Sequence, residues 1–129
     1  MTGVQTCALP ILDGVTVSFS DTREAIRVLG GSLVITDSLL DLGTGGIKIG
    51  YSYSSSLRVS DSEIISSSTS PTITVEMGCV TLLGASVKND IDAAIYNKGS
   101  LYLSGDIGIF GAKYDVVTEQ PIFFSDNVS

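Results

Sequence analysis

The chain contains no histidine and only two cysteines among its 129 residues. Without histidine, Ser-His-Asp and Cys-His nucleophilic sites and most zinc sites are excluded. Positive charge is scarce, because 7 Lys and Arg stand against 14 Asp and Glu, which gives a net charge of −7. Nucleic acids and anionic membranes, which need a basic surface, are therefore not expected as partners. No uninterrupted apolar run approaches the roughly 18 residues of a membrane-spanning helix, so we expect no membrane insertion.

Runs rich in Ala, Glu, Leu and Lys, which are typical of helices, are also absent. The chain instead repeats short apolar-x-apolar triplets, whose period of two indicates β-strands. One series starts with isoleucine at intervals of 21, 26, 22 and 27 residues: Ile26–Val28, Ile47–Ile49, Ile73–Val75, Ile95–Asn97 and Ile122–Phe124. A second series follows it at intervals of 24, 23 and 21 residues: Leu33–Ile35, Leu57–Val59, Val80–Leu82 and Leu101–Leu103.

A third, weaker series follows a serine or another small residue: Ser38–Leu40, Ser62–Ile64, Ala85–Val87 and, loosely, Asp106–Ile107. Glycine, serine, aspartate and asparagine fill the intervals, as in turns. A repeat of this length indicates stacked units, because one repeat cannot bury its own apolar face. The sequence predicts an all-β fold, a right-handed parallel β-helix (β-solenoid) of four to five coils of 21–27 residues, with three short strands per coil.

A leucine-rich repeat and an antiparallel sandwich are the alternatives to this architecture. A leucine-rich repeat has a similar period, but its Leu-x-x-Leu-x-Leu-x-x-Asn pattern is absent. An antiparallel sandwich would show turn signals at shorter spacing and would not match triplet on triplet. The regular spacing favours the β-helix over both.

Residues 2–11 read TGVQTCALPI and resemble an in-frame translation of a sequencing adapter. We therefore interpret residues 1–11 as a non-native scar and set them aside. Cys7 falls within the scar, which leaves Cys79 unable to form an internal disulfide. Residues 12–129 are interpreted as a β-helix fragment that is truncated at its N-terminus, and the C-terminus is a second candidate for truncation.

The predicted coils resemble those of bacterial surface proteins with right-handed β-helix repeats, including adhesin-like and autotransporter-passenger-like proteins. The resemblance covers roughly residues 26–109 and is carried by SLVITDS, SLRVSDS and AIYNKGSLYLSG, which begin at Ser32, Ser56 and Ala94. It implies a structural or binding segment of a secreted or cell-surface bacterial protein, without catalysis or cofactor, that stacks on the remaining coils of its parent. Polysaccharide lyases and pectinase-like hydrolases share the fold, so a carbohydrate-active enzyme is the alternative. A trimeric phage tail fibre is a third interpretation.

Residues between the inward members of each triplet should point outward. One outward column is then Arg27, Lys48, Thr74, Tyr96 and Phe123, and its neighbour is Val34, Arg58, Thr81 and Tyr102. Aromatic rings can stack on sugar faces and arginine can bond carboxylates. Lys48, Arg58, Tyr96 and Tyr102 are therefore candidate ligand-binding residues, with a polysaccharide or host-surface glycan as partner. Ordinary decoration of an exposed sheet is the other explanation for them.

Asp37 and Asp61 occupy the same position one coil apart. Stacked carboxylates could bind Ca²⁺ or act as an acid/base pair, with Arg58 between them. Aspartate at a turn more often bonds its own backbone, and Gly84 and Gly105 take this position in the next coils. We therefore predict no catalytic residue and no metal ligand. Cys79 takes the place that serine holds in other coils, and a reactive thiol is not expected there.

Overall fold

Seventeen short strands make up the fold in the computed structural model, and no helix occurs among the described residues. These residues are 4–6, 11–14, 16–18, 26–28, 31–50 and 55–124, and for 4–6, 11–13, 17 and 18 the backbone alone is described. No segment of the described chain is a helix long and apolar enough to cross a membrane.

The strands form three sheets in which every pair is parallel. Sheet A contains β1 (Val4–Thr6), β4 (Ile26–Val28), β7 (Ile47–Ile49), β10 (Ile73–Val75), β13 (Ile95–Asn97) and β16 (Val116–Thr118). Sheet B contains β2 (Ile11–Asp13), β5 (Ser32–Thr36), β8 (Ser56–Ser60), β11 (Cys79–Leu83), β14 (Ser100–Ser104) and β17 (Ile122–Phe124). Sheet C contains β3 (Thr16–Ser18), β6 (Leu39–Asp41), β9 (Glu63–Ser66), β12 (Ser86–Asn89) and β15 (Gly108–Gly111).

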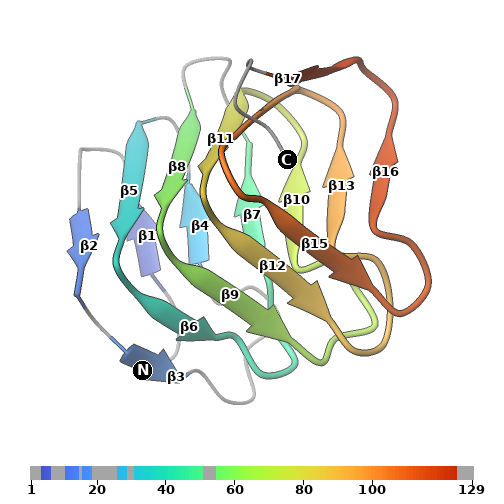
Figure 1. Ribbon diagram of the computed structural model, residues 1–129. Coiled ribbons are helices and arrows are strands. Elements are labelled where there is room, and N and C mark those ends of the chain that lie inside the picture. The colour runs from blue at the N-terminus through green and yellow to red at the C-terminus, as the bar shows by residue number, and fades with distance from the viewer. Residues whose placement is uncertain are drawn as a thin grey trace.

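The chain passes from sheet A to sheet B to sheet C in every turn, so that each strand pairs with its counterparts one turn earlier and later. From β4 onward it completes four turns and adds two strands of a fifth, as the repeat predicted. It descends on the near side in Figure 1 and rises behind while it advances to the right, which makes the winding right-handed. The parallel pairing rules out the antiparallel sandwich, and the lack of helices in the described part of the chain rules out the leucine-rich repeat.

The inward members of the triplets form continuous apolar columns along the axis. In sheet A, Ile26, Ile47, Ile73 and Ile95 lie in register and are at most 1% exposed. Sheet B adds Leu33, Leu57, Val80 and Leu101, and sheet C adds Leu40, Ile64 and Val87. Full burial of such a side chain stabilises the fold by about 1.5–3 kcal/mol. The inward side chains of the triplets therefore form one apolar core, and their burial holds the three sheets together.

One triplet of the isoleucine series was assigned to the wrong sheet. Ile122–Phe124 is β17, which pairs with β14 of sheet B, and sheet A continues instead with β16, where Val116 pairs with Ile95. The inward residue that ends β16 is Thr118, so the segment does not show an apolar-x-apolar triplet. Thr118 lies beneath another polar residue, Asn97, whose Nδ2 donates to the Thr118 hydroxyl at 3.2 Å.

The loose third-series member Asp106–Ile107 is also corrected. The strand is Gly108–Gly111, and its inward residue, Ile109, pairs with Val87. Three residues rather than two separate this strand from β14, so it begins one position later than the corresponding strand of the three preceding turns. At the other end of sheet A, β1 pairs with β4, with Val4 opposite Ile26. The adapter origin of residues 1–11 stays a prediction, and Cys7 lies outside the described residues.

The corner between sheets B and C depends on a left-handed backbone conformation. Gly14, Gly84 and Gly105 have φ values of 64°, 63° and 79°, and Asp37 and Asp61 have 47° and 49°. Glycine enters this region without a steric penalty, and aspartate is among the few other residues that tolerate it. Both aspartates therefore serve as turn residues, which agrees with the role that the sequence favoured.

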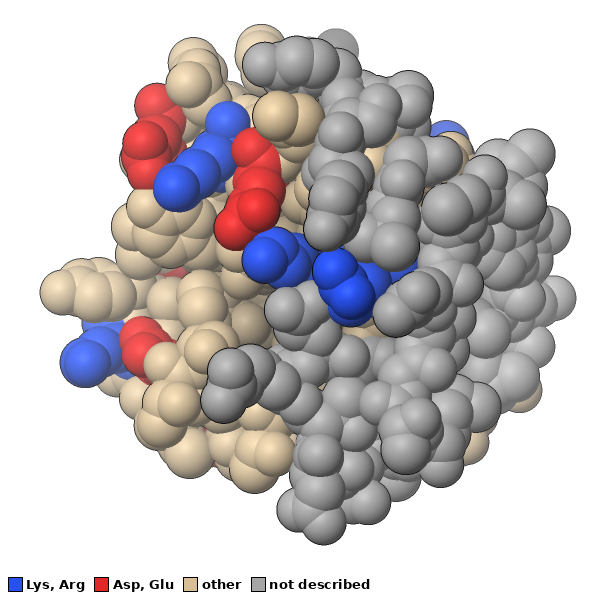
Figure 2. Space-filling model, turned by 180° about the vertical axis from the view of Figure 1, so that it is seen from behind, with Lys and Arg blue, Asp and Glu red and all other residues tan. Residues whose placement is uncertain are grey.

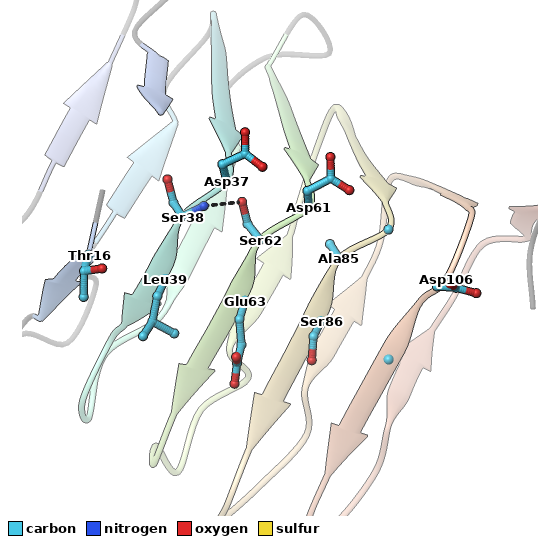
Figure 3. Close-up of a pocket in the computed structure, with 12 residues that line it drawn as sticks. Thr16, Asp37, Ser38, Leu39, Asp61, Ser62, Glu63, Ala85, Ser86 and Asp106 are labelled. Carbon is cyan, nitrogen blue, oxygen red and sulfur yellow. Dashed lines mark hydrogen bonds between the residues drawn. The ribbon is translucent and has the colours of Figure 1, made fainter. Parts of the chain in front are cut away.

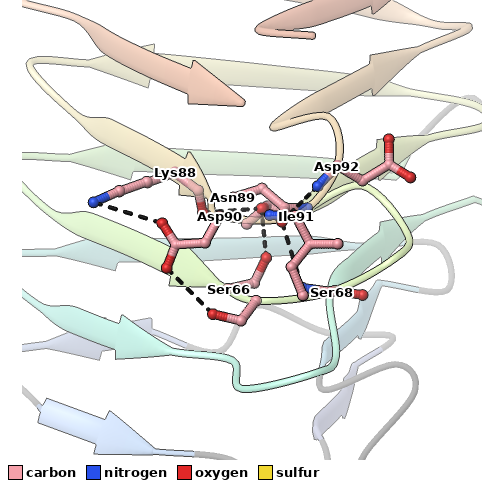
Figure 4. Close-up of polar contacts among 9 residues, drawn as sticks. Ser66, Ser68, Lys88, Asn89, Asp90, Ile91 and Asp92 are labelled. Atoms are coloured by element: carbon pink, nitrogen blue, oxygen red, sulfur yellow. Dashed lines mark hydrogen bonds and ion pairs between the residues drawn. The ribbon is translucent and has the colours of Figure 1, made fainter. Parts of the chain in front are cut away.

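A buried asparagine closes the corner between sheets C and A. Asn89 is fully buried at the end of β12, and its Nδ2 donates to the carbonyl oxygens of Ser70 and Ala93, both at 2.9 Å. Its Oδ1 accepts the backbone N–H groups of Ile91 and Asp92 at 2.9 and 3.1 Å (Figure 4). One side chain thus bonds to backbone groups of two successive coils at this corner.

Candidate functional site

The two outward columns expected from the sequence lie on different sheets. In sheet A, register places Lys48, Thr74 and Tyr96 side by side on β7, β10 and β13. In sheet B, it places Arg58, Thr81 and Tyr102 side by side on β8, β11 and β14. The same order of cation, threonine and tyrosine therefore occurs twice, in the same three turns of the solenoid.

The structure does not bring the four candidate residues into one site, because each column has its own sheet face. It also changes the end of each column. Phe123 follows Tyr102 in sheet B, and Val117 takes the place in sheet A that the sequence had assigned to Phe123.

Lys48 and Tyr96 of the sheet A column both contact nearby charged side chains. The Lys48 Nζ lies 3.5 Å from a carboxylate oxygen of Glu76, and the Tyr96 hydroxyl donates to Glu119 at 2.6 Å. The Lys98 Nζ lies 5.6 Å from the centre of the Tyr96 ring, within the range of a cation–π contact. Figure 2, which views the molecule from the side of sheet A, shows basic and acidic side chains next to one another across the described part of this face.

The hydrogen bond to Glu119 raises the pKa of the Tyr96 hydroxyl above its ordinary value of 10.0. Partial loss of hydration and the negative charge of Glu119 act in the same direction. Tyr96 therefore stays protonated, and keeps its hydrogen bond, to a higher pH than a free tyrosine would.

Four strands of sheet B, β5, β8, β11 and β14, present a face with a single charge. On β5, β8, β11 and β14 the outward positions alternate with buried ones, and Arg58 is the one charged residue among them. The others are mostly hydroxyl-bearing: Ser32, Thr36, Ser56, Ser60, Thr81, Ser100, Tyr102 and Ser104, together with Val34, Cys79 and Leu83. Arg58 is exposed, and within the described part of the chain its guanidinium has no hydrogen bond or ion pair.

An aromatic stack ends the sheet B column. The rings of Tyr102 and Phe123 lie 4.9 Å apart between centres with an angle of 18° between their planes, and the side chains are 42% and 46% exposed. A groove of about 460 Å³ runs along them from Thr81 to Phe124 and is also lined by Leu83 and Ser104. Phe123 stacks on one face of the tyrosine ring, and the neighbour of Tyr102 on the other side of the column is the short side chain of Thr81, which lines the same groove.

A second, acidic groove follows the corner between sheets B and C. It measures about 620 Å³, and four carboxylates line it: Asp37, Asp61, Glu63 and Asp106. The carboxylates of Asp37 and Asp61 project in the same direction from adjacent turns (Figure 3). The groove is lined by no Lys or Arg of the described residues, and Arg58 lies on the sheet B face outside it. The aspartates and the arginine of the enzyme interpretation thus do not share one groove.

Ser38 and Ser62 form the floor of this acidic groove and are nearly buried. The Ser38 backbone N–H donates to the Ser62 hydroxyl at 3.0 Å, and this hydroxyl donates to the Ser60 carbonyl at 2.8 Å. The first of these bonds joins adjacent turns, the second fixes the Ser62 hydroxyl within its own turn, and together they explain why serine follows aspartate at this corner. The described residues contain no group of three or more His, Cys, Asp and Glu side chains arranged to hold a metal ion.

Cys79 lies in the serine column as the sequence predicted, between Ser56 and Ser100. Its side chain is partly buried, and this burial raises the pKa of the thiol above its ordinary value of 9.0. A raised pKa reduces the thiolate fraction at neutral pH, so the thiol has low reactivity. In the first two turns of the same column the hydroxyls of Ser32 and Ser56 bond to each other at 2.7 Å.

Fold and surface together define the chain as a parallel β-solenoid with one charge-paired face and one hydroxyl-rich, aromatic face. No protein-family model matches the chain, and neither a curated protein nor a solved structure shows significant similarity to it.

Proposed function

We propose that this chain is a structural and binding segment of a secreted or cell-surface bacterial protein, and that it presents rigid sheet faces to a polysaccharide or host-surface glycan. The observation that supports this function is the register of the outward columns. Hydrogen-bonded parallel strands hold outward side chains about 4.8 Å apart along the axis. Successive side chains can then contact successive units of an extended polymer without a change in the backbone.

The chemistry of the outward residues agrees with a sugar ligand. Hydroxyl groups of serine, threonine and tyrosine both donate and accept hydrogen bonds, as sugar hydroxyls do. The exposed rings of Tyr102 and Phe123 offer apolar surface to the C–H groups of a pyranose. Each contact is weak, and affinity arises when several are made along one chain.

The test is binding of the full chain to a panel of neutral and acidic polysaccharides, measured by affinity electrophoresis, with product analysis of the same mixtures. We expect retardation by at least one polysaccharide and no shortening of it. Failure to bind any member of the panel contradicts the proposed function. Cleavage of a polysaccharide that is lost in Asp61→Asn would replace it with the carbohydrate-active enzyme.

A further inference from the structure

We propose that a carboxylate-bearing sugar, a uronate unit of an acidic glycan, binds on sheet B in the slot above Thr81, between Arg58 and Tyr102. This inference rests on the proposed function and names the ligand class and the face that carries it. In it, one face of the sugar ring stacks on the open face of the Tyr102 ring, and the uronate carboxylate accepts hydrogen bonds from the Arg58 guanidinium.

The dimensions of the slot suit one sugar ring. Arg58 and Tyr102 lie on strands separated by the single strand β11, so their columns are two strand spacings, or about 10 Å, apart. A ring in van der Waals contact on both sides needs about 7–8 Å, because each contact takes roughly 3.5–4.0 Å. The short side chain of Thr81 lies between Arg58 and Tyr102 on β11.

Charge favours an anionic sugar here although the whole chain is acidic. Arg58 is the one charged residue on the outward positions of β5, β8, β11 and β14, and its donors have no partner among the described residues. The nearest corner carboxylate in sequence, Asp61, follows three residues later, about 10 Å along an extended strand. That distance exceeds the Debye length of about 8 Å at physiological salt. A guanidinium in direct contact therefore outweighs the corner carboxylates.

The equivalent slot on sheet A is excluded by its own contacts. Glu76 pairs with Lys48, and Lys98 lies over the Tyr96 ring. An anionic sugar would have to displace a carboxylate from the lysine and an ammonium group from the ring. Sheet A therefore provides a matched internal control for sheet B, with the same residue types in the same three turns.

The test uses isothermal titration calorimetry of the full chain with an oligogalacturonate and with the same oligosaccharide after reduction of its carboxyl groups. We expect the native oligosaccharide to bind at least about tenfold more tightly than the reduced one, which corresponds to about 1.4 kcal/mol. Arg58→Gln should remove this difference. Tyr102→Ala should weaken both ligands by about tenfold, and Thr81→Tyr, which fills the slot, should abolish both interactions.

The matched variants Lys48→Gln and Tyr96→Ala should bind both ligands as the wild type does. Circular dichroism melts of all variants check that the exposed substitutions leave the fold unchanged. Equal affinity for the native and reduced oligosaccharides, or equal losses in the sheet A and sheet B variants, would overturn the inference while leaving the proposed function intact. Binding of polysaccharides from the panel without binding of the oligogalacturonate has the same meaning, and a wild type that binds no glycan overturns both.

Discussion

The central turn and the C-terminal strands use similar residues but bury them to different extents. In the central turn, Ile73, Val80 and Val87 are at most 1% exposed, because each has a strand on both sides. In β15, β16 and β17 the corresponding Ile109, Val116 and Ile122 pack against the core but are only partly buried. Exposed rings gather in the same region: Phe110, Tyr114, Phe123 and Phe124 are 46–63% exposed. Burial in this fold is thus a property of neighbouring turns rather than of a residue, and stability should follow nearest-neighbour contacts.

The largest expected loss of stability comes from a truncated side chain in the central apolar column of sheet A. Ile73→Ala should lower the free energy of unfolding by about 3–4 kcal/mol, because the cavity forms between two packed turns. Ile122→Ala, at a partly exposed position with one neighbouring strand, should cost about 1 kcal/mol. Urea unfolding of the full chain, followed by circular dichroism, measures both. Equal costs would mean that the C-terminal strands are as well packed as the centre.

A somewhat smaller loss of stability is expected when the buried hydrogen bonds at the corner between sheets C and A are removed. Asn89→Ala should cost about 2–3 kcal/mol, because the hydrogen bonds of this fully buried side chain to backbone N–H and C=O groups are lost. Asp90→Ala is the matched control, since its contacts with Lys88 and Ser67 lie at the surface, and it should stay within about 0.5 kcal/mol of the wild type. If both variants melt alike, the buried network contributes little.

The smallest effect concerns the contact between β13 and the loop that follows β16. The pKa of Tyr96 is raised because the protonated hydroxyl donates a hydrogen bond to the Glu119 carboxylate. Glu119→Gln should therefore lower that pKa toward its ordinary value. A raised folded-state pKa means that the stabilisation is fully present below the unfolded pKa of about 10 and is lost as pH rises through the folded one. Titration of tyrosinate absorbance in wild type, Glu119→Gln and Tyr96→Phe isolates this group. An unchanged titration in Glu119→Gln would show that the hydrogen bond is not made in solution.

The fold was predictable because most of the core residues come from apolar-x-apolar triplets that recur once per turn. Where the inward residues are apolar, as in Ile47–Ile49 or Leu57–Val59, the pattern gives both strand and register. It failed at Val116–Thr118, where the inward position is polar. The signal was present one turn earlier, since Ile95–Asn97 also ends in a polar residue that needs a polar partner in the next turn.

The order of outward side chains in each column was predictable from the sequence, but the contacts that these side chains make were not. Register follows from the triplets, so the neighbours of Thr74 and Thr81 could be read from the sequence. Glu76 and Glu119, which contact Lys48 and Tyr96 of the sheet A column, lie just beyond the strands, where spacing does not determine side-chain direction. The sequence does not distinguish Asn89 from the other turn residues, because its burial depends on how two successive corners fold over each other.

The corners of the solenoid differ in how much chain they contain. Two residues join sheets B and C in three successive turns, at Asp37–Ser38, Asp61–Ser62 and Gly84–Ala85, whereas the interval from sheet A to sheet B ranges from two residues to six, the six lying between Ile49 and Ser56. In these three turns the corner between sheets B and C has a constant length. Turns of unequal length stay aligned because the other two corners contain the additional residues. A foreign peptide grafted between Gly50 and Ser55, which are themselves hydrogen-bonded to the neighbouring turns, would therefore be held at a fixed position along the solenoid axis.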